Sequence, residues 1–288
     1  MPVGPAGVGD TKPVLIGMIK TNRIKFEAGA LLLALALPAM SGVPPQPVSV
    51  YRNGFSMTIR LGRDLYEALP SESRDKLDPQ VVTLQMEDLP LVVPLTVTEG
   101  NHVLGQVSIS AGFIDLVNHV AHAKAIERIQ PGYFATYVKN FALLSTSDAA
   151  AQPPNIADTR FWTEDVMNDQ IGYFNQMISL VMAINLSHHY LGHCAKYSAK
   201  LAGAGDKPVP INNLLTTEEW AASVKAGAVD ALNCAVSTVG LRALFAAIDL
   251  MPRRPEWTAY VIPAEADIKQ LDKQLERYED DFFHGKLK

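Results

Sequence analysis

Residues 170–195 read QIGYFNQMISLVMAINLSHHYLGHCA, and this run contains no Asp, Glu, Lys or Arg. A helix without charge on any face is typical of a buried position in a globular protein or of a membrane span. Asn, Gln, Ser and three His residues make the run too polar for a membrane span. The stretch therefore predicts the buried central helix of a globular body. We expect this helix to begin after Thr163 and to reach about Leu201.

Two of the histidines in this run have the spacing of metal ligands. In a continuous helix, His189 and His193 are one turn apart on the same face, so both imidazoles can reach one ion. This spacing is the geometric part of the HExxH zinc signature. His188 is turned about 100° away from that face, and we expect it to be a neighbour of the site rather than a ligand.

A second run with few charges follows Thr216-Thr-Glu-Glu219, which has the pattern of a helix capping box. Between Trp220 and Leu241 the only charged residues are Lys225 and Asp230. Asp230 lies on a stripe of small residues that would let another helix approach closely. A carboxylate withdrawn from water in this way needs a cation or several hydrogen-bond donors. The small residues of the stripe are Ser223, Ala226, Gly227, Asn233, Cys234 and Ser237.

These observations predict a Zn²⁺ site formed by His189, His193 and Asp230, with an open fourth position. Glu219 and Glu218 are competing candidates for the third ligand, although a Glu at a helix start ordinarily caps the helix and compensates its dipole. Cys194 and Cys234 are close in sequence to the proposed ligands. Three states are open for them: a disulfide between the two in an oxidising compartment, two free thiols, or thiols near the metal.

The residues that carry this site resemble the gluzincin-type zinc peptidases. Residues 106–118, QVSISAGFIDLVN, are similar to the edge strand and following helix that precede the active-site helix in that family, and residues 189–193, HYLGH, are similar to its HExxH motif. The resemblance implies zinc binding and assigns Asp230 to the position of the acidic third ligand. Tyr190 stands where the family has its catalytic Glu, so a hydrolase of this kind would need a displaced base. Glu127 and Glu164 are the nearest candidates.

The histidines also have an ordinary structural interpretation. A buried His that donates a hydrogen bond to a backbone carbonyl or a carboxylate is common, and HxxxH arises by chance. A second pair, His119 and His122, would complete or neighbour the site, or would form the polar edge of an amphipathic helix, which we favour.

The remaining patterns predict a mostly helical α+β protein, with a small N-terminal antiparallel sheet followed by a helical body that contains two long buried helices. Residues 49–288 form one domain, with the sheet in 49–110 and the helical body in 111–288. Strands are expected from Ser49 to Leu61 and within 81–110, where Pro90 and Pro94 place their strand at an edge. Helices are expected at 65–77, 111–130, 133–144, 163–201, 216–250 and 265–283.

The N-terminus has the order of a secretory signal. A basic segment from Met18 is followed by a short apolar run, Ala28–Ala39, and then by small residues and a Pro-rich linker. We expect a leader and signal peptide in 1–42, a linker in 43–48, and export to the periplasm or the medium. Glu27 beside the apolar run leaves an uncleaved anchor as the alternative. No stable membrane span is expected beyond the signal segment. A net charge of −5 and the absence of a basic stripe disfavour nucleic acid as a partner.

Together these features predict an exported zinc-binding protein that resembles a metallopeptidase, either a hydrolase with a displaced base or a catalytically weakened relative. Its substrate would be a small molecule or a peptide. The alternative is a non-catalytic extracytoplasmic helical protein with a binding or structural role, in which the histidines are core residues.

Overall fold

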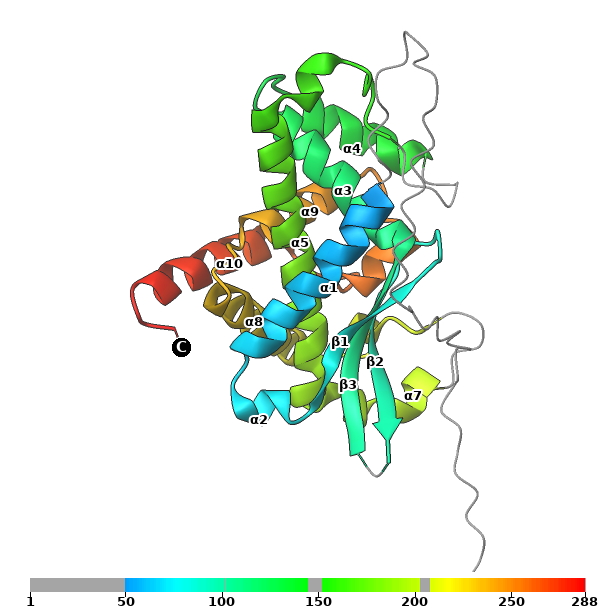
Figure 1. Cartoon of the computed structure of the whole chain (residues 1–288), viewed down its shortest axis with the longest axis vertical. Coiled ribbons are helices and arrows are strands. Elements are labelled where there is room, and N and C mark those ends of the chain that lie inside the picture. The colour runs from blue at the N-terminus through cyan, green and yellow to red at the C-terminus, as the bar shows by residue number, and fades with distance from the viewer. Residues whose placement is uncertain (1–49, 101, 145–151, 203–207, 288) are drawn as a thin grey trace, which may run out of the picture.

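A computed structural model describes residues 50–100, 102–144, 152–202 and 208–287 of the chain (Figure 1). Ten α-helices, three strands and three short 3-10 helices are found in these ranges. The α-helices are α1 (Val50–Ala68), α2 (Ser71–Arg74), α3 (Ala111–Ile126), α4 (Tyr133–Leu144), α5 (Glu164–Tyr190), α6 (His193–Lys196), α7 (Ser198–Ala202), α8 (Thr217–Asn233), α9 (Val239–Leu250) and α10 (Ile268–Phe283). The strands are β1 (Leu77–Gln85), β2 (Val92–Glu99) and β3 (His102–Ser110), and the 3-10 helices are η1 (Thr159–Trp162), η2 (Ile211–Asn213) and η3 (Glu256–Tyr260).

The mostly helical α+β class is confirmed, but the sheet is mixed rather than antiparallel. Its strand order is β1-β3-β2. β2 and β3 form an antiparallel hairpin, whereas β1 pairs in parallel with the other side of β3. The hairpin is local, but the β1–β3 pairing is a long-range contact that strand patterns do not reveal. Pro94 lies in β2 at an edge of the sheet, as expected from its missing N–H.

The strand predicted from Ser49 to Leu61 is wrong, because the described part of this segment belongs to α1. The odd-numbered apolar residues suggested a period of two. In the structure the buried side chains are Thr58, Leu61 and Leu65 in α1 and Leu69 just after it, and their spacings of three and four are those of a helix. α1 crosses the sheet at Gly62, where a Cβ atom would lie 2.4 Å from Val82 Cγ2. A side chain at this position would therefore require Val82 and its neighbour Val81 to move.

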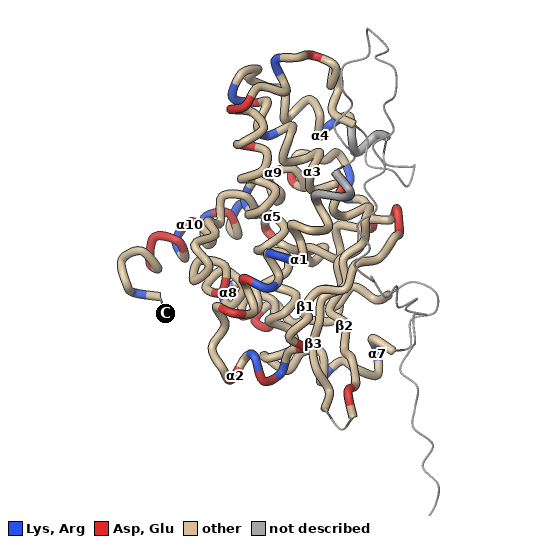
Figure 2. Tube along the Cα trace, in the orientation of Figure 1, with Lys and Arg blue, Asp and Glu red and all other residues tan. Residues whose placement is uncertain are grey.

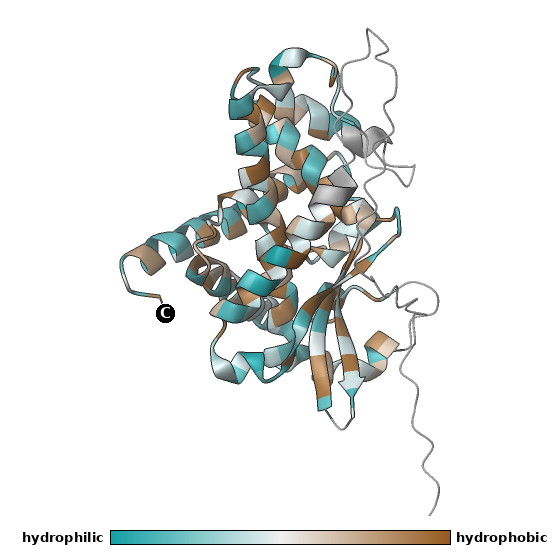
Figure 3. Cartoon of the chain, in the orientation of Figure 1, coloured by the Kyte–Doolittle hydropathy of each residue, from teal (hydrophilic) through white to brown (hydrophobic). Residues whose placement is uncertain are grey.

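The central buried helix predicted from residues 170–195 is confirmed as α5. Every residue from Met177 to His188 is buried. α5 contacts the sheet and the helices α1, α3, α8 and α9, which surround it in Figure 1. The charged and hydrophilic residues are found on outer elements such as α10 (Figures 2 and 3).

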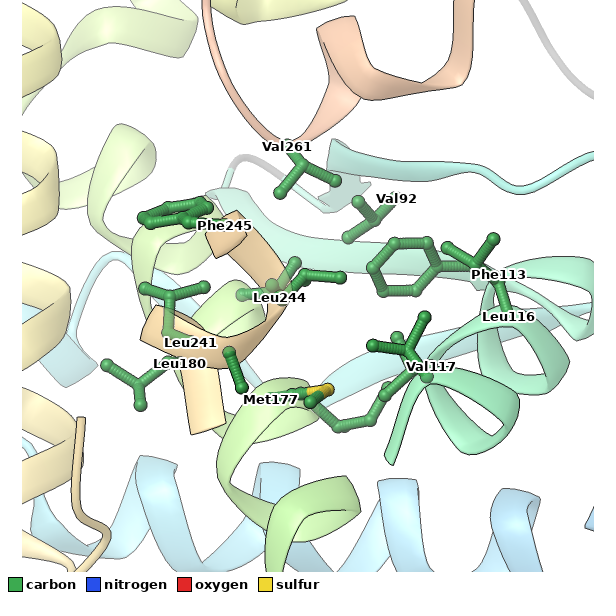
Figure 4. Close-up of a cluster of buried hydrophobic side chains, with 14 of the residues drawn as sticks. Val92, Phe113, Leu116, Val117, Met177, Leu180, Leu241, Leu244, Phe245 and Val261 are labelled. Carbon is green, nitrogen blue, oxygen red and sulfur yellow. The ribbon is translucent and has the colours of Figure 1, made fainter. Parts of the chain in front are cut away.

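The core lies where α3, α5, α9 and the sheet meet. Figure 4 shows side chains from α3, α5, α9, β2 and the end of η3 converging on one another. Phe113, Leu116, Val117, Met177, Leu180, Leu241, Leu244 and Phe245 are buried members of this cluster. Such packing explains why α5 needs no polar face over this length.

Both long helices end earlier than the sequence predicted. α5 stops at Tyr190, and Gly192 has a φ of 83°, a left-handed conformation that terminates a helix. α8 stops at Asn233, and α9 starts again at Val239 after Ala235, whose φ is 58°. The predicted capping box at Thr216 and Glu219 is confirmed, with both of its hydrogen bonds present.

The predicted signal segment, leader and linker (1–48) lie outside the described residues. Within the described ranges, no helix combines the length and the apolar character needed to cross a membrane.

Close contact between α5 and α8 depends on Gly227, as the stripe of small residues predicted. A Cβ atom at Gly227 would lie 2.7 Å from the backbone nitrogen of Ile184, which cannot move without shifting the buried helix. We expect Gly227→Ala to lower the free energy of unfolding by about 2 kcal/mol or more, measured by urea denaturation.

Gly172 provides the matched control, because it also lies inside a helix. Among the described residues, nothing lies within 4 Å of a Cβ at Gly172, so Gly172→Ala should raise stability by up to about 1 kcal/mol. Equal effects of the two substitutions would contradict the close helix contact.

Candidate functional site

The residues of the HYLGH motif do not lie on one helix. His189 is in the last turn of α5, Gly192 turns the chain, and His193 is the first residue of the separate short helix α6. The one-turn relation between His189 and His193 therefore does not hold, because it requires a continuous helical path between them.

His189 faces the sheet. Its Nε2–H donates a hydrogen bond of 2.9 Å to the backbone carbonyl of Gln106 in β3. The imidazole packs against Gly105, where a Cβ atom would lie 2.2 Å from the ring. Burial lowers the pKa of His189 to about 4, so the ring is neutral at pH 7. This histidine joins the end of α5 to the central strand.

Asp230 is bound by Tyr190 rather than by the histidines. The Tyr190 hydroxyl donates a hydrogen bond of 2.5 Å to Asp230 Oδ2. Burial raises the pKa of Asp230 to about 6, although the hydrogen bond from Tyr190 opposes the shift. The same burial, with the neighbouring carboxylate, raises the pKa of Tyr190, so its phenol stays protonated at neutral pH. Asp230 thus obtains from Tyr190 a donor that a buried carboxylate needs.

His188 and His193 meet each other in a buried polar cluster with Ser223 of α8. Their two Nδ1 atoms are 3.3 Å apart. Ser223 Oγ lies 3.0 Å from the His188 Nδ1 and 3.2 Å from the His193 Nδ1. All three residues are buried, and His188 and Ser223 are completely inaccessible to solvent. We call these residues the His188–His193–Ser223 cluster.

Both histidines of the cluster are neutral at pH 7. Burial, together with the neighbouring histidines, lowers the pKa of His188 to about 3. Burial also lowers the pKa of His193, while Glu219 acts in the opposite direction. Among the described residues, the buried Nε2 of His188 has no hydrogen-bond partner. An unpaired buried polar atom typically costs about 1–3 kcal/mol through lost hydration, a cost that His188 shares with other side chains that have such an atom, for example Asn175 and Trp220.

The predicted set of three zinc ligands is not brought together. Each of its members has a different partner, Gln106 for His189, the cluster for His193 and Tyr190 for Asp230. Within the described residues, no group of three or more His, Cys, Asp or Glu side chains is arranged to hold a metal ion. The structure brings together His188 and His193 instead, with Ser223 between them.

Both cysteines belong to the described part of the chain, and they are not bonded to each other. Cys194 Sγ is 4.0 Å from His189 Nε2, and Cys234 donates to the carbonyl of Asp64. Burial raises the pKa of Cys194 to about 12 and that of Cys234 to about 11. Both are therefore neutral thiols at pH 7, without the thiolate character of a nucleophile.

The second histidine pair is associated with the opposite end of α5. The Nε2–H of His122 donates a hydrogen bond of 2.8 Å to the carbonyl of Phe161 in η1. The His122 ring makes an edge contact with the ring of Trp162. His122 is buried, so the predicted polar edge of an amphipathic helix is wrong at this residue. Burial lowers the pKa of His119 to about 4, with a further contribution from His122. His122 thus anchors α3 to η1.

Neither candidate for a displaced base lies near the histidines of the motif. Glu127 accepts hydrogen bonds from the backbone N–H groups of Gly132 and Phe134, which shapes the turn before α4. Glu164 is the first residue of α5, and His188 is separated from it by about 36 Å of helix at 1.5 Å per residue.

Comparison with known proteins found no matching family model, curated protein or solved structure. The gluzincin resemblance therefore rests only on residues 106–118 and on the HYLGH motif.

Sequence reasoning missed His188 and Ser223 as cluster members. The available signal was Gly192, which ends helices readily. If the helix ends at Gly192, the spacing of four residues no longer places His189 and His193 on the same helix face.

The hydrogen bond between Tyr190 and Asp230 can be tested by a double-mutant cycle. Tyr190→Phe should lower the free energy of unfolding at pH 7 by about 1–3 kcal/mol, because it leaves a buried carboxylate without this donor. In an Asp230→Asn background the same change should cost less, with a coupling energy above about 0.5 kcal/mol in urea denaturation. Additive effects would contradict the coupling.

The lowered pKa of His119 predicts that the folded protein loses stability in acid. The folded pKa of this histidine is lowered to about 4, so its contribution to stability is present above the unfolded value of 6.5 and is lost as the pH falls toward 4. In this window, each pH unit should cost up to about 1.4 kcal/mol through this one group.

We expect His119→Gln to remove that part of the pH dependence when urea denaturation is repeated from pH 7 to pH 4. His102→Gln is the control, because His102 is exposed at the start of β3. An unchanged slope in the His119 variant would show that His119 is not the responsible group.

Proposed function

We propose that this protein binds a single divalent transition metal ion, most simply Zn²⁺, through the Nδ1 atoms of His188 and His193. The observation that carries the proposal is the distance of 3.3 Å between these two atoms. Two nitrogen ligands at about 2.0–2.1 Å from a tetrahedral ion are about 3.3–3.4 Å apart. The spacing in the protein therefore equals one edge of a zinc coordination tetrahedron.

The surroundings of the pair support the same interpretation. Ser223 Oγ, at 3.0 and 3.2 Å from the two nitrogens, completes a triangle with nearly equal sides. The Ser223 hydroxyl, or a water hydrogen-bonded to it, can supply an oxygen ligand to the ion. The pKa values of both histidines are lowered by burial, so both rings are available as neutral ligands at pH 7. Imidazole ligands favour zinc and similar ions over Mg²⁺ or Ca²⁺.

The proposal does not include peptide hydrolysis. A base that activates metal-bound water must accept a proton near neutral pH. Tyr190 does not meet this requirement, because its pKa is raised and its hydroxyl is engaged with Asp230. Metal binding in a structural or sensory role is therefore the function that the arrangement supports best. Export remains a prediction from residues 18–41.

The alternative function is a non-catalytic helical protein in which the His188–His193–Ser223 cluster is only a hydrogen-bonded core group. The same three atoms satisfy this interpretation if the histidines donate to Ser223 and Ser223 donates to the carbonyl of Glu219, 3.1 Å away. Either function leaves the Nε2 of His188 without a partner among the described residues, as an acceptor in the core cluster and as an N–H donor when Nδ1 binds a metal ion. Metal titration separates the two functions.

Chelator-treated protein should bind about one Zn²⁺ per chain in isothermal titration calorimetry. His188→Gln and His193→Gln should each weaken binding more than about 100-fold, because loss of groups that only support a ligand already costs 10–100-fold. His189→Gln is the matched control and should bind as the wild type does, since His189 faces β3.

Two outcomes would overturn this proposal. The first is wild-type protein that binds no zinc. The second is loss of binding in His189→Gln with retention in His188→Gln, which would favour the HxxxH pair. Circular dichroism shows whether each variant is folded. If a variant of a buried histidine does not fold, nitrogen NMR of the wild-type histidines identifies the ligand atoms directly. Zinc should then be bound to the Nδ1 atoms of His188 and His193.

A further inference from the structure

The helix that carries His193 has little to hold it in place by itself. α6 contains only four residues and follows a left-handed glycine, so it does not inherit the rigidity of α5. A metal site needs its ligands fixed to within a fraction of an ångström. The contacts between α6 and α8 therefore decide whether His193 is held in the geometry for coordination.

Glu219 of α8 makes these contacts. Its Oε1 accepts a hydrogen bond of 2.6 Å from Lys196 Nζ, and its Oε2 accepts one of 2.7 Å from the Tyr197 hydroxyl. Lys196 also lies over the Tyr197 ring, 4.8 Å from its centroid. These interactions lower the pKa of Glu219 to about 2, so the carboxylate is ionised at pH 7. One carboxylate thus binds two side chains that follow His193 by three and four residues.

The carboxylate is also placed directly beside the cluster. Ser223 Oγ donates to the backbone carbonyl of Glu219 one turn earlier in α8, so both residues lie on the helix face that meets α6. Thr216 N–H donates to Glu219 Oε2 at 2.9 Å and fixes the same side chain from the other direction. The face of α8 therefore holds α6 at two points, His193 through Ser223 and residues 196–197 through Glu219.

We propose that Glu219 is the positioning residue of the metal site, holding α6 against α8 so that His193 Nδ1 remains at coordination distance from His188 Nδ1. This inference rests on the proposed metal-binding function. Glu219 acts through Lys196 and Tyr197 rather than as a ligand, because both of its carboxylate oxygens are already occupied by three donors. To bind the ion, it would have to give up an ammonium group and the helix cap.

The test measures Zn²⁺ affinity by calorimetry and the visible absorption of the Co²⁺-substituted protein, which reports the ligand set. Glu219→Gln retains an oxygen for Thr216 N–H but removes the charge that binds Lys196. We expect it to weaken Zn²⁺ binding about 10–100-fold with an unchanged Co²⁺ spectrum. Tyr197→Phe should weaken binding in the same direction by a smaller factor.

Two control variants separate positioning from charge and from stability. Glu218→Gln removes the same charge from an exposed neighbouring residue and should leave the affinity unchanged. Thr216→Ala removes the capping bond while leaving Lys196 and Tyr197 in place. It should lower stability by about 1 kcal/mol without changing Zn²⁺ affinity.

The outcomes distinguish failure of this inference from failure of the proposed function. If the wild type binds zinc and Glu219→Gln binds equally well, the positioning role is wrong and the metal site stands. If Glu219→Gln changes the Co²⁺ spectrum, Glu219 is itself a ligand and the inference is overturned. If the wild type binds no zinc, both proposals fall. Should Glu219→Gln fail to fold, Tyr197→Phe and Lys196→Met decide the question by the same two measurements.

Discussion

The buried length of α5 is the constraint on which the rest of the structure depends. From Met177 to His188 every residue is buried, so other elements must cover the helix on all sides. The sheet and the helices α1, α3, α8 and α9 do so. α8 and α9 come closest at glycines, because a Cβ at Gly227 or Gly240 would collide with the backbone of α5. Burial of this helix thus determines both the core and the approach of the helix that carries Ser223.

The same constraint explains the chemistry at the end of α5. Polar side chains carried into the core lose water and must find partners or ligands within the protein. His189 donates a hydrogen bond to a carbonyl of β3, and Tyr190 donates one to Asp230. His188 lies within hydrogen-bond distance of His193 and Ser223. Burial also keeps all three histidines neutral, the state in which imidazole binds transition metals. Histidines in this region would therefore not have to lose a proton at pH 7 before they bind a metal ion.

Several features of the fold could be predicted because their causes are local. The charge-free run predicted α5, the Thr216–Glu219 capping box predicted the start of α8, and Pro94 predicted an edge strand. The strand expected before Leu61 failed because a few apolar residues at odd positions imitated a period of two, whereas the buried side chains Thr58, Leu61 and Leu65 follow the spacing of a helix. The parallel pairing of β1 with β3 could not be predicted, since it joins strands separated by β2.

The sequence by itself determined that the end of α5 is rich in histidine, free of charge and close to α8, because composition and small-residue spacing are local properties. Only the tertiary structure decided which histidines meet. Helical spacing relates His189 to His193 only while the helix continues, and the left-handed Gly192 ends that relation. After this glycine the chain contacts α8, where Tyr197 donates to Glu219 and His193 lies against Ser223. The pair that results is His188 with His193.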